Sequence, residues 1–247
     1  MLMAAVQFAR RRKPKCDECP LADLCPSVKV DLNDQATYAA ANLFLSNFTE
    51  EHFDRDWYQT GAFDSTDGLY DDEKYKLVKF IWCHFIDNAP YRIEKGDYDN
   101  GNLQRIATDV VNRELNRLTG LTLSDADMTY DRTPEGQAIP DSAEAHGGYL
   151  YLKQEYGQGN YNPPCAIVTS ATDLGDNIYE LTYEVYSAGG MLLPSDIPES
   201  TYGLPENQFI AAIQADASRG RTETCTVRVA KGDGAPTFTL LKMGVYD

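Results

Sequence analysis

The 247-residue chain contains no apolar run of the roughly 18 residues that a membrane-spanning helix needs, which argues against a transmembrane segment. Basic residues are scarce as well, because 22 Lys and Arg stand against 38 Asp and Glu, for a formal net charge of −16. This charge argues against a dedicated DNA- or RNA-binding protein, which usually has a basic face. It has three histidines and none of the H-E-x-x-H, G-x-S-x-G, Walker or G-x-G-x-x-G motifs. We therefore expect a protein that binds rather than catalyses, and no catalytic residue is assigned.

The charge is unevenly distributed along the chain. Residues 1–32 hold six basic and four acidic residues, for a net charge of +2, so residues 33–247 carry −18. With 43% hydrophobic and 11% aromatic residues overall, the chain is not a disordered acidic polymer. We expect a basic, cysteine-rich tail at residues 1–32 that is not an independent domain, followed by a single acidic domain at residues 33–247.

The first residues do not have the order of a secretory signal. A weakly apolar stretch, residues 1–9, precedes the basic residues 10–13, whereas in a secretory signal the positive charge comes first. The order predicts a cytoplasmic location, and an extracytoplasmic location if the natural N-terminus differs.

Three of the six cysteines lie in one short run with the spacing C-x2-C-x5-C, namely Cys16, Cys19 and Cys25. Thiolates packed this closely suit a 4Fe-4S cluster or zinc, because a short loop can aim them at one point. The neighbouring Lys and Arg residues favour the thiolate form. A tail without metal is the alternative. Candidates for a fourth metal ligand elsewhere in the chain are Cys83, His84, Cys165 and Cys225.

The stretch RKPKCDECPLADLCP, from Arg12 to Pro26, resembles the C-terminal iron–sulfur loop of endonuclease III-type and adenine-specific DNA glycosylases. That family has the pattern C-x6-C-x2-C-x5-C, of which the three cysteines match the last three, while Ala9 stands where the first should be. The resemblance implies an iron–sulfur protein of DNA-repair ancestry, with any nucleic-acid contact confined to residues 10–29. The family's catalytic Lys and Asp belong to a helical domain before the loop, and the matching stretch carries neither.

The first half of the acidic part has helical periodicity. A first helix is expected after Asp34, a suitable N-cap, because apolar residues recur at helical spacing up to Phe48. A second is expected from about Asp71 to Asp87, with an apolar stripe of Val78, Ile81, Trp82 and Phe85. A third is expected from about Leu103 to Thr119, ended by Gly120.

Beyond residue 145 the apolar period becomes two, which indicates strands. The turn residues 173–177 separate two of them and predict a hairpin. Helices followed by short strands predict an α+β domain, with N-terminal helices packed on a C-terminal antiparallel β-meander of about five or six strands. The expected strands are Tyr149–Tyr156, Cys165–Thr172, Ile178–Tyr186, Phe209–Ala215, Thr222–Ala230 and Thr237–Tyr246.

The stretch NLFLSNFT, from Asn42 to Thr49, resembles a segment of uncharacterised modules in Gram-positive bacterial lipoproteins and surface proteins. The helices that follow and the final β-meander fit such modules too. The resemblance implies an extracytoplasmic accessory domain with no assigned chemistry.

Tyrosine is frequent in the strand-forming half. Rows of exposed tyrosine suit a peptide, carbohydrate or protein ligand, whereas tyrosines on the inner face of a sheet belong to the core. We expect the ligand of this chain on such a tyrosine-rich face. The residues concerned are Tyr149, Tyr151, Tyr156, Tyr161, Tyr179, Tyr183, Tyr186 and Tyr202.

Other groups have a structural interpretation that we prefer to the functional one. The acidic run at residues 50–56 is expected to be a solvated face, and His84 beside Cys83 a packed side chain. The stretches 64–68 and 97–102 lack the spacing of a calcium loop and are expected to be turns. Cys165 and Cys225 are expected to be buried thiols, or a disulfide in an exported protein. The sequence predicts a non-enzymatic binding or accessory module with a vestigial cysteine-rich tail, with an iron–sulfur protein as the alternative.

Overall fold

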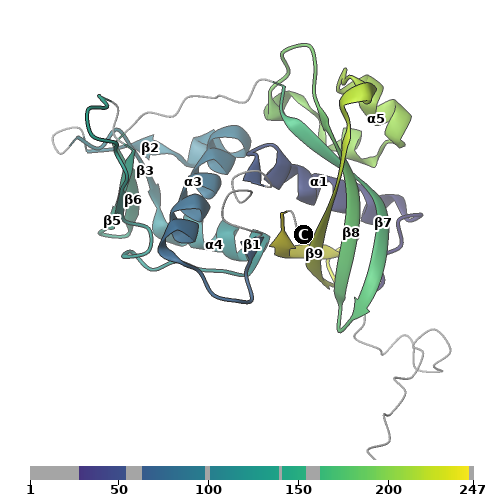
Figure 1. Ribbon diagram of the computed structural model, residues 1–247, viewed down its shortest axis with the longest axis horizontal. Coiled ribbons are helices and arrows are strands. Elements are labelled where there is room, and N and C mark those ends of the chain that lie inside the picture. The colour runs from purple at the N-terminus through teal and green to yellow at the C-terminus, as the bar shows by residue number, and fades with distance from the viewer. Residues whose placement is uncertain (1–27, 54–62, 98–100, 139–140, 154–161, 245–247) are drawn as a thin grey trace, which may run out of the picture.

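The computed structural model describes residues 28–53, 63–97, 101–138, 141–153 and 162–244. Within these ranges the chain forms helices and two antiparallel five-stranded sheets (Figure 1). The α+β class predicted from the sequence is confirmed, with the helices mostly N-terminal to the strands. The strands form two sheets rather than the single meander that was expected.

The first sheet has the strand order β1-β10-β9-β8-β7, and its last four strands are the meander expected from the sequence. The β7–β8 hairpin turns at Asp176 and Asn177, with φ of 56° and 60°. This left-handed conformation is one that Asp and Asn tolerate better than most residues, so the predicted turn is confirmed. The strands are β1 (Phe63–Asp64), β7 (Pro164–Gly175), β8 (Ile178–Ser187), β9 (Arg221–Ala230) and β10 (Thr237–Met243).

The second sheet has the order β2-β3-β6-β5-β4, and of its strands only β6 was expected. The helix predicted from Leu103 is wrong in its first turn, since residues 104–107 form a strand. Ile106 pairs with Leu150 and is 1% exposed, so pairing and burial outweigh the helical spacing. The strands are β2 (Glu94–Lys95), β3 (Gln104–Ala107), β4 (Tyr130–Asp131), β5 (Ser142–His146) and β6 (Tyr149–Leu152).

The described helices are α1 (Gln35–Thr49), α3 (Asp71–Asn88), α4 (Thr108–Thr119) and α5 (Glu206–Ala212). Asp34 caps α1 as expected, because its Oδ2 accepts a hydrogen bond of 2.9 Å from the Thr37 amide. Gly120 ends α4 in the left-handed conformation, at φ +74°. The strand predicted at residues 209–215 is wrong, because α5 covers its first half. Phe209 and Ile213 are four residues apart, so in this helical segment both side chains are buried in the same core cluster.

Helices α3 and α4 lie between the two sheets, and α1 packs against β7 (Figure 1). Their apolar side chains form one continuous core that both sheets share. At its centre the rings of Phe48 and Phe80 stack with their centroids 5.2 Å apart. The ring centroid of Phe53 lies 4.6 Å from that of Phe80. These aromatic contacts pack α1 against α3 and so fix the position of one helix relative to the other.

Helix α1 also joins the free edge of β7 through its side chains. Asn42 Oδ1 accepts a hydrogen bond of 2.7 Å from the Val168 amide, and Ser46 Oγ accepts one of 2.9 Å from the Ala166 amide. Thr49 Oγ1 donates to the Pro164 carbonyl at 2.8 Å. The three side chains, spaced four and three residues apart, therefore act as the missing neighbouring strand, and we name them the α1 ladder.

Residues 50–56 were predicted to form a solvated acidic face, and this prediction is wrong for Glu50. Glu50, directly after α1, is 2% exposed, and its Oε1 accepts a hydrogen bond of 3.1 Å from the Tyr202 hydroxyl. Burial is the main cause that raises the pKa of Glu50 to about 8; the Tyr202 hydrogen bond opposes it and the nearby Asp87 adds to it. Glu50 is therefore a buried, protonated carboxyl at neutral pH. The sequence could not show this, because residues 51–56 around it are strongly polar.

The described chain begins at Val28, whose amide donates to Asn177 Oδ1 at 2.8 Å. The Tyr179 hydroxyl donates to the Val28 carbonyl at 3.0 Å. The last residues of the predicted tail thus contact the β7–β8 hairpin, and the domain boundary at residue 33 stays a prediction. None of the described helices is long and apolar enough to cross a membrane.

Replacing Asn42 by alanine tests the α1 ladder. The Asn42→Ala substitution leaves the Val168 amide and the Tyr202 carbonyl buried without their partner, since Asn42 Nδ2 also donates to Tyr202 at 2.8 Å. We expect the free energy of unfolding, measured in urea, to fall by about 3 kcal/mol. The control is Asn116→Ala on the exposed side of α4, which should change it by less than about 0.5 kcal/mol. Equal effects of the two substitutions would contradict the ladder.

Replacing Glu50 by glutamine tests the burial of its proton. Because the folded pKa of about 8 lies above that of an unfolded glutamate, the folded state holds the proton more tightly. The contribution of Glu50 to the free energy of unfolding is fully present below about pH 4.5. It falls as the pH rises to about 8, by up to about 1.4 kcal/mol per pH unit. Unfolding measured from pH 5 to 9 should show a flatter dependence in Glu50→Gln than in the wild type. Glu135→Gln, on an exposed turn, is the control, and parallel curves for Glu50→Gln and the wild type would show that Glu50 is ionised.

Candidate functional site

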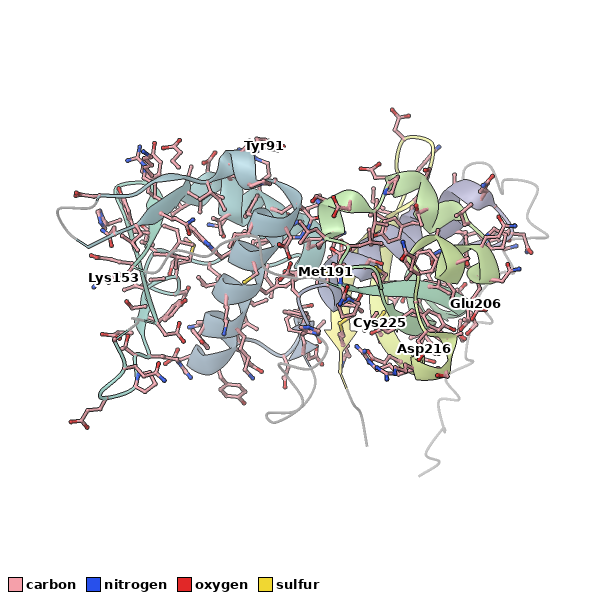
Figure 2. The ribbon with its side chains drawn as sticks, turned by 90° about the horizontal axis from the view of Figure 1, so that it is seen from above. Tyr91, Lys153, Met191, Glu206, Asp216 and Cys225 are labelled. Carbon is pink, nitrogen blue, oxygen red and sulfur yellow. The ribbon has the colours of Figure 1, made fainter. Side chains whose placement is uncertain are left out.

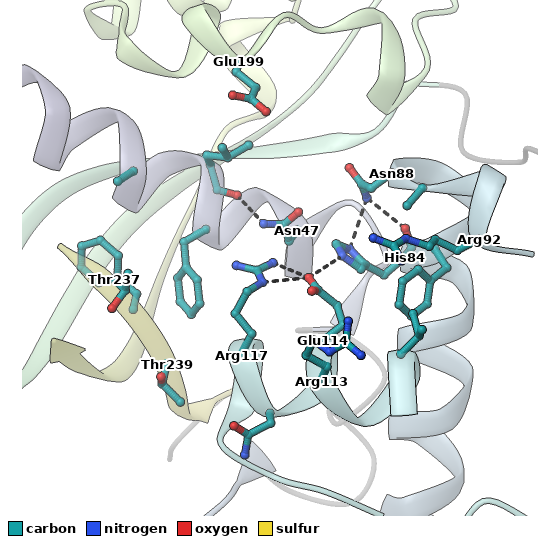
Figure 3. A pocket seen from close by; sticks show the side chains of 18 of the residues that line it. Asn47, His84, Asn88, Arg92, Arg113, Glu114, Arg117, Glu199, Thr237 and Thr239 are labelled. Atoms are coloured by element: carbon teal, nitrogen blue, oxygen red, sulfur yellow. Dashed lines mark hydrogen bonds and ion pairs between the residues drawn. The ribbon is translucent and has the colours of Figure 1, made fainter. Parts of the chain in front are cut away.

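A cleft of about 760 Å³ opens between α1, α3, α4 and the start of β10 (Figure 3). This volume is in the range of small-molecule binding sites. Its apolar wall is made by Phe44 of α1, Phe85 of α3 and Phe238 of β10. At the rim, Tyr91 of the short helix η3 (Pro90–Arg92) is 78% exposed (Figure 2). The cleft therefore combines an apolar wall with access from solvent.

Three arginines line the same cleft, although the chain as a whole is strongly acidic. Arg113 and Arg117 lie one turn apart on α4, and Arg92 ends η3. Arg113 pairs with Asp109 at 2.8 Å in an exposed contact, which contributes little to stability and is open to competition. Among the described residues, no carboxylate lies within ion-pair distance of Arg92. Glu199 also lines the cleft and Arg117 pairs with Glu114, so the lining carries charge of both signs, and Arg92 is the arginine of this wall that has no ion pair among the described residues.

Glu114 is the carboxylate at the base of the arginine wall. Arg117 donates to its Oε1, with Nε at 2.9 Å, and His84 Nε2 lies 3.3 Å from the same oxygen (Figure 3). Partial burial acts to raise the pKa of Glu114, but the hydrogen bonds from His84 and Arg117 outweigh it and lower the pKa to about 2. Glu114 is thus ionised at any ordinary pH and is a weak base.

The contacts of His84 define its tautomer. The ring is 5% exposed, and Asn88 Nδ2 lies 3.2 Å from both its Nδ1 and its backbone carbonyl. The carbonyl can only accept, so it fixes the Asn88 amide with Nδ2 toward His84, and Nδ1 accepts as well. In the neutral ring Nε2 then carries the proton and donates it to Glu114. Both ring nitrogens are occupied inside the protein.

Cys83 and His84 are adjacent in sequence, and a packed side chain was predicted for His84. His84 lines the cleft and Cys83 does not, and the bonds of His84 to Asn88 and Glu114 agree with a packed histidine. Sequence reasoning missed the three arginines. The available signal was the spacing of Arg113 and Arg117 beside Val110, which puts positive charge on one flank of the apolar face of α4.

The predicted metal ligands Cys16, Cys19 and Cys25 lie outside the described residues. Within the described part of the chain no group of three His, Cys, Asp or Glu side chains could hold a metal. Of the candidates for a fourth ligand, Cys165 and Cys225 are at most 1% exposed, and His84 is engaged as above. Burial raises the pKa of both thiols, so neither is a ready thiolate.

The suggested disulfide between Cys165 and Cys225 is wrong, since both are free thiols. Cys165 lies on β7 and Cys225 on β9, with β8 between them. Two strand spacings of about 4.8 Å exceed the Cα separation that a disulfide spans. Their side chains also belong to different clusters of the core.

The tyrosines expected to form a ligand-binding face are mostly core residues. Tyr156 and Tyr161 lie outside the described residues. Tyr149 is half-buried, with the Arg105 guanidinium 4.2 Å from its ring centroid. A ligand on a tyrosine-rich face stays a prediction, with little exposed tyrosine to support it. The buried members are Tyr151, Tyr179, Tyr183, Tyr186 and Tyr202.

The loop at residues 64–68 has the turn chemistry expected of it. Asp64 Oδ1 accepts hydrogen bonds from the amide and hydroxyl of Thr66, at 2.9 and 2.6 Å, and the carboxylate also pairs with Lys242. These bonds occupy the oxygens that a calcium ion would need. In the loop at 97–102, residues 98–100 lie outside the described residues.

Comparison with known proteins gives one short match. Residues 10–25 match the family described as the iron-sulfur binding domain of endonuclease III. The match supports the resemblance of the cysteine loop seen in the sequence. No curated protein and no solved structure matches the chain, so the resemblance of residues 42–49 to lipoprotein modules stays a prediction. The matched segment covers a small part of the 247 residues and lies before the acidic fold begins.

Proposed function

We propose that the acidic domain is a binding module and that its ligand occupies the cleft between α1, α3 and α4. The observation that carries the proposal is the wall of Arg92, Arg113 and Arg117 facing an apolar surface in one cleft. Arginine binds carboxylate and phosphate groups through paired N–H donors. The ligand class is therefore an anionic group attached to an apolar body.

The apolar body has a defined place in this proposal. Phe44, Phe85 and Phe238 come from three elements and line the cleft with the edges of residues that are at most 5% exposed. Phe44 and Phe238 have ring centroids 5.6 Å apart. A small aromatic or aliphatic group that contacts these rings is removed from water, which favours binding.

The polar groups of the cleft support binding rather than a reaction. Among the described residues that line it, none is a serine or a cysteine. His84 has both ring nitrogens engaged, and Glu114 has a pKa of about 2, far from that of an effective general base. These groups instead hold Arg117 in place.

Two small probes test the proposal. Phenylacetate and phenyl phosphate each join an anion to an aromatic ring, and phenylacetamide has the ring without the charge. We expect the anions to bind the wild-type chain, measured by shifts of backbone amide NMR signals, with at least tenfold higher affinity than phenylacetamide. The better of the two anions identifies the carboxylate or the phosphate as the natural group.

The variant Arg113→Gln with Arg117→Gln should lose about tenfold or more in affinity for the better anion. Arg219→Gln is the matched control, because Arg219 is an exposed arginine paired with an acid three residues away and lies outside the cleft. Anion affinity that equals that of the amide, or that survives the double substitution, would contradict an anion-binding cleft.

The match to the iron–sulfur domain favours a second candidate function, which is cluster binding by Cys16, Cys19 and Cys25. Of the candidates for a fourth ligand, Cys165 and Cys225 are buried in the sheet and His84 is engaged in the cleft, whereas Cys83 is half-buried. The three thiolates fit only an incomplete version of the family's four-cysteine site. No chemistry beyond holding the cluster follows for this chain.

Metal analysis tests this second function. If the loop holds a cluster, protein purified without oxygen should contain iron and sulfide in a fixed ratio to the protein. It should also absorb light at about 400 nm. The Cys16→Ala variant should lose both, whereas Cys225→Ala, which changes a buried thiol of the sheet, should retain them. Protein that contains neither iron nor sulfide after reconstitution would rule out the cluster.

A further inference from the structure

Helix α1 brings a buried polar side chain to the wall of the cleft. Its residues Ala40, Leu43, Phe44 and Asn47 line the cleft and recur at helical spacing, on a different face from the α1 ladder. Asn47 is 9% exposed, and its Nδ2 donates a hydrogen bond of 2.9 Å to the Leu43 carbonyl. A carbonyl can only accept, so this bond fixes the orientation of the amide. Asn47 Oδ1 is then directed away from the Leu43 carbonyl, and no described residue donates a hydrogen bond to it (Figure 3).

Glu199 contributes a carboxylate to the same cleft. It is exposed and begins the short helix η6 (Glu199–Gly203). This helix is held against α1, because Asn42 Nδ2 donates to the Tyr202 carbonyl at 2.8 Å. In the view of Figure 3, Glu199 lies on the opposite side of the cleft from the arginines of α4, and Asn47 lies between them.

The charges that line the cleft are therefore of both signs. Arg113 and Arg117 each pair with an acidic residue of their own helix. Arg92 and Glu199 have no ion-pair partner within the part of the chain that the structure describes. A ligand with only negative charge is attracted by Arg92 and repelled by Glu199, whereas a ligand that carries a charge of each sign is attracted by both.

We propose that the ligand of the cleft is a zwitterion, namely a free amino acid with an apolar side chain. Its carboxylate binds the arginine wall, its ammonium group binds Asn47 Oδ1 and Glu199, and its side chain contacts the phenylalanine edges. This inference rests on the function proposed above and narrows its ligand class.

The hydrogen-bonding capacity of an ammonium group matches these two acceptors. An ammonium group has three N–H donors and no acceptor, and Asn47 Oδ1 and the Glu199 carboxylate can only accept. Hydrogen bonds to the charged Glu199 are stronger than those between neutral groups, and its charge selects an ammonium group over a hydroxyl. Because the Leu43 carbonyl already holds the Asn47 amide in place, binding costs little side-chain freedom there.

The apolar side chain has room in the same arrangement. An α-amino acid carries its carboxylate and its ammonium group on one carbon atom, so its side chain can extend away from both. The edges of Phe44, Phe85 and Phe238 form the apolar wall of the cleft that this side chain would contact. An aromatic or aliphatic amino acid therefore fits the cleft better than a polar one.

Three matched probes test the inference with the full chain. Phenylalanine carries both charges, 3-phenylpropionate lacks the ammonium group, and phenethylamine lacks the carboxylate. At about pH 7 we expect phenylalanine to bind about fivefold or more tightly than 3-phenylpropionate, measured by shifts of backbone amide NMR signals. Phenethylamine should bind about tenfold or more weakly than phenylalanine, because the arginines repel its charge.

Two variants assign the ammonium group to its acceptors. Glu199→Gln changes an exposed side chain and should lower the affinity for phenylalanine to about that of 3-phenylpropionate. The affinity for 3-phenylpropionate should stay constant or rise, since a like charge is removed. Asn47→Ala should also reduce the preference for phenylalanine over 3-phenylpropionate. Glu135→Gln, on an exposed turn outside the cleft, is the matched control and should bind all three probes as the wild type does.

The outcomes separate this inference from the function on which it rests. If phenylacetate and 3-phenylpropionate bind but phenylalanine binds no better, or keeps its advantage in Glu199→Gln, the amino-acid ligand is overturned and the anion-binding cleft stands. If phenylacetate, phenyl phosphate, 3-phenylpropionate and phenylalanine all fail to bind, the proposed function fails and the inference fails with it. A preference for phenylalanine that Glu199→Gln removes supports the inference.

Discussion

The fold depends on the bonds between one helix and one strand edge. Asn42, Ser46 and Thr49 of α1 bond the backbone of β7 where a further strand would otherwise be needed. A helix advances about 6 Å in four residues and a strand about 6.6 Å in two, so side chains at this spacing match alternate backbone groups. The match fixes the height and rotation of α1 on the sheet. The wall of the cleft that α1 contributes is placed with it, because Phe44 and Asn47 belong to the same helix.

The helices and strands that could be predicted from the sequence are those in which apolar residues repeat at a regular local spacing. Helices α1 and α3 and strands β7 to β10 have apolar residues repeated over at least ten residues or bounded by a clear turn. The failures are short segments whose state depends on distant partners. Residues 104–107 have apolar spacing that fits a helix, but Leu150 supplies a strand partner that no local pattern reveals. Strands β1, β2 and β4 have two residues each, too few to show any alternation.

The site was harder to predict than the fold, for a related reason. The arginines of the cleft come from α4 and from η3, and the phenylalanines come from three further elements, so their meeting is a property of tertiary packing. Glu50 shows the limit most clearly. It begins a run of acidic residues, and local composition indicates solvent exposure, yet the end of α1 turns its carboxyl into the core. The cysteine loop is the opposite case, since its pattern is entirely local and the family match agrees with it.

Within the described residues, the edge strands of the two sheets are short or irregular. Strands β1, β2 and β4 are edge strands of only two residues, and α1 covers the first half of β7. The outer half of β7 has irregular register between Val168 and Ser170 and again between Asp173 and Gly175, which breaks the row of backbone groups a new strand would need. Among the described strands, these edges therefore offer few backbone groups for pairing with another chain. Short and irregular edge strands disfavour edge-to-edge aggregation, independently of the negative charge of the chain.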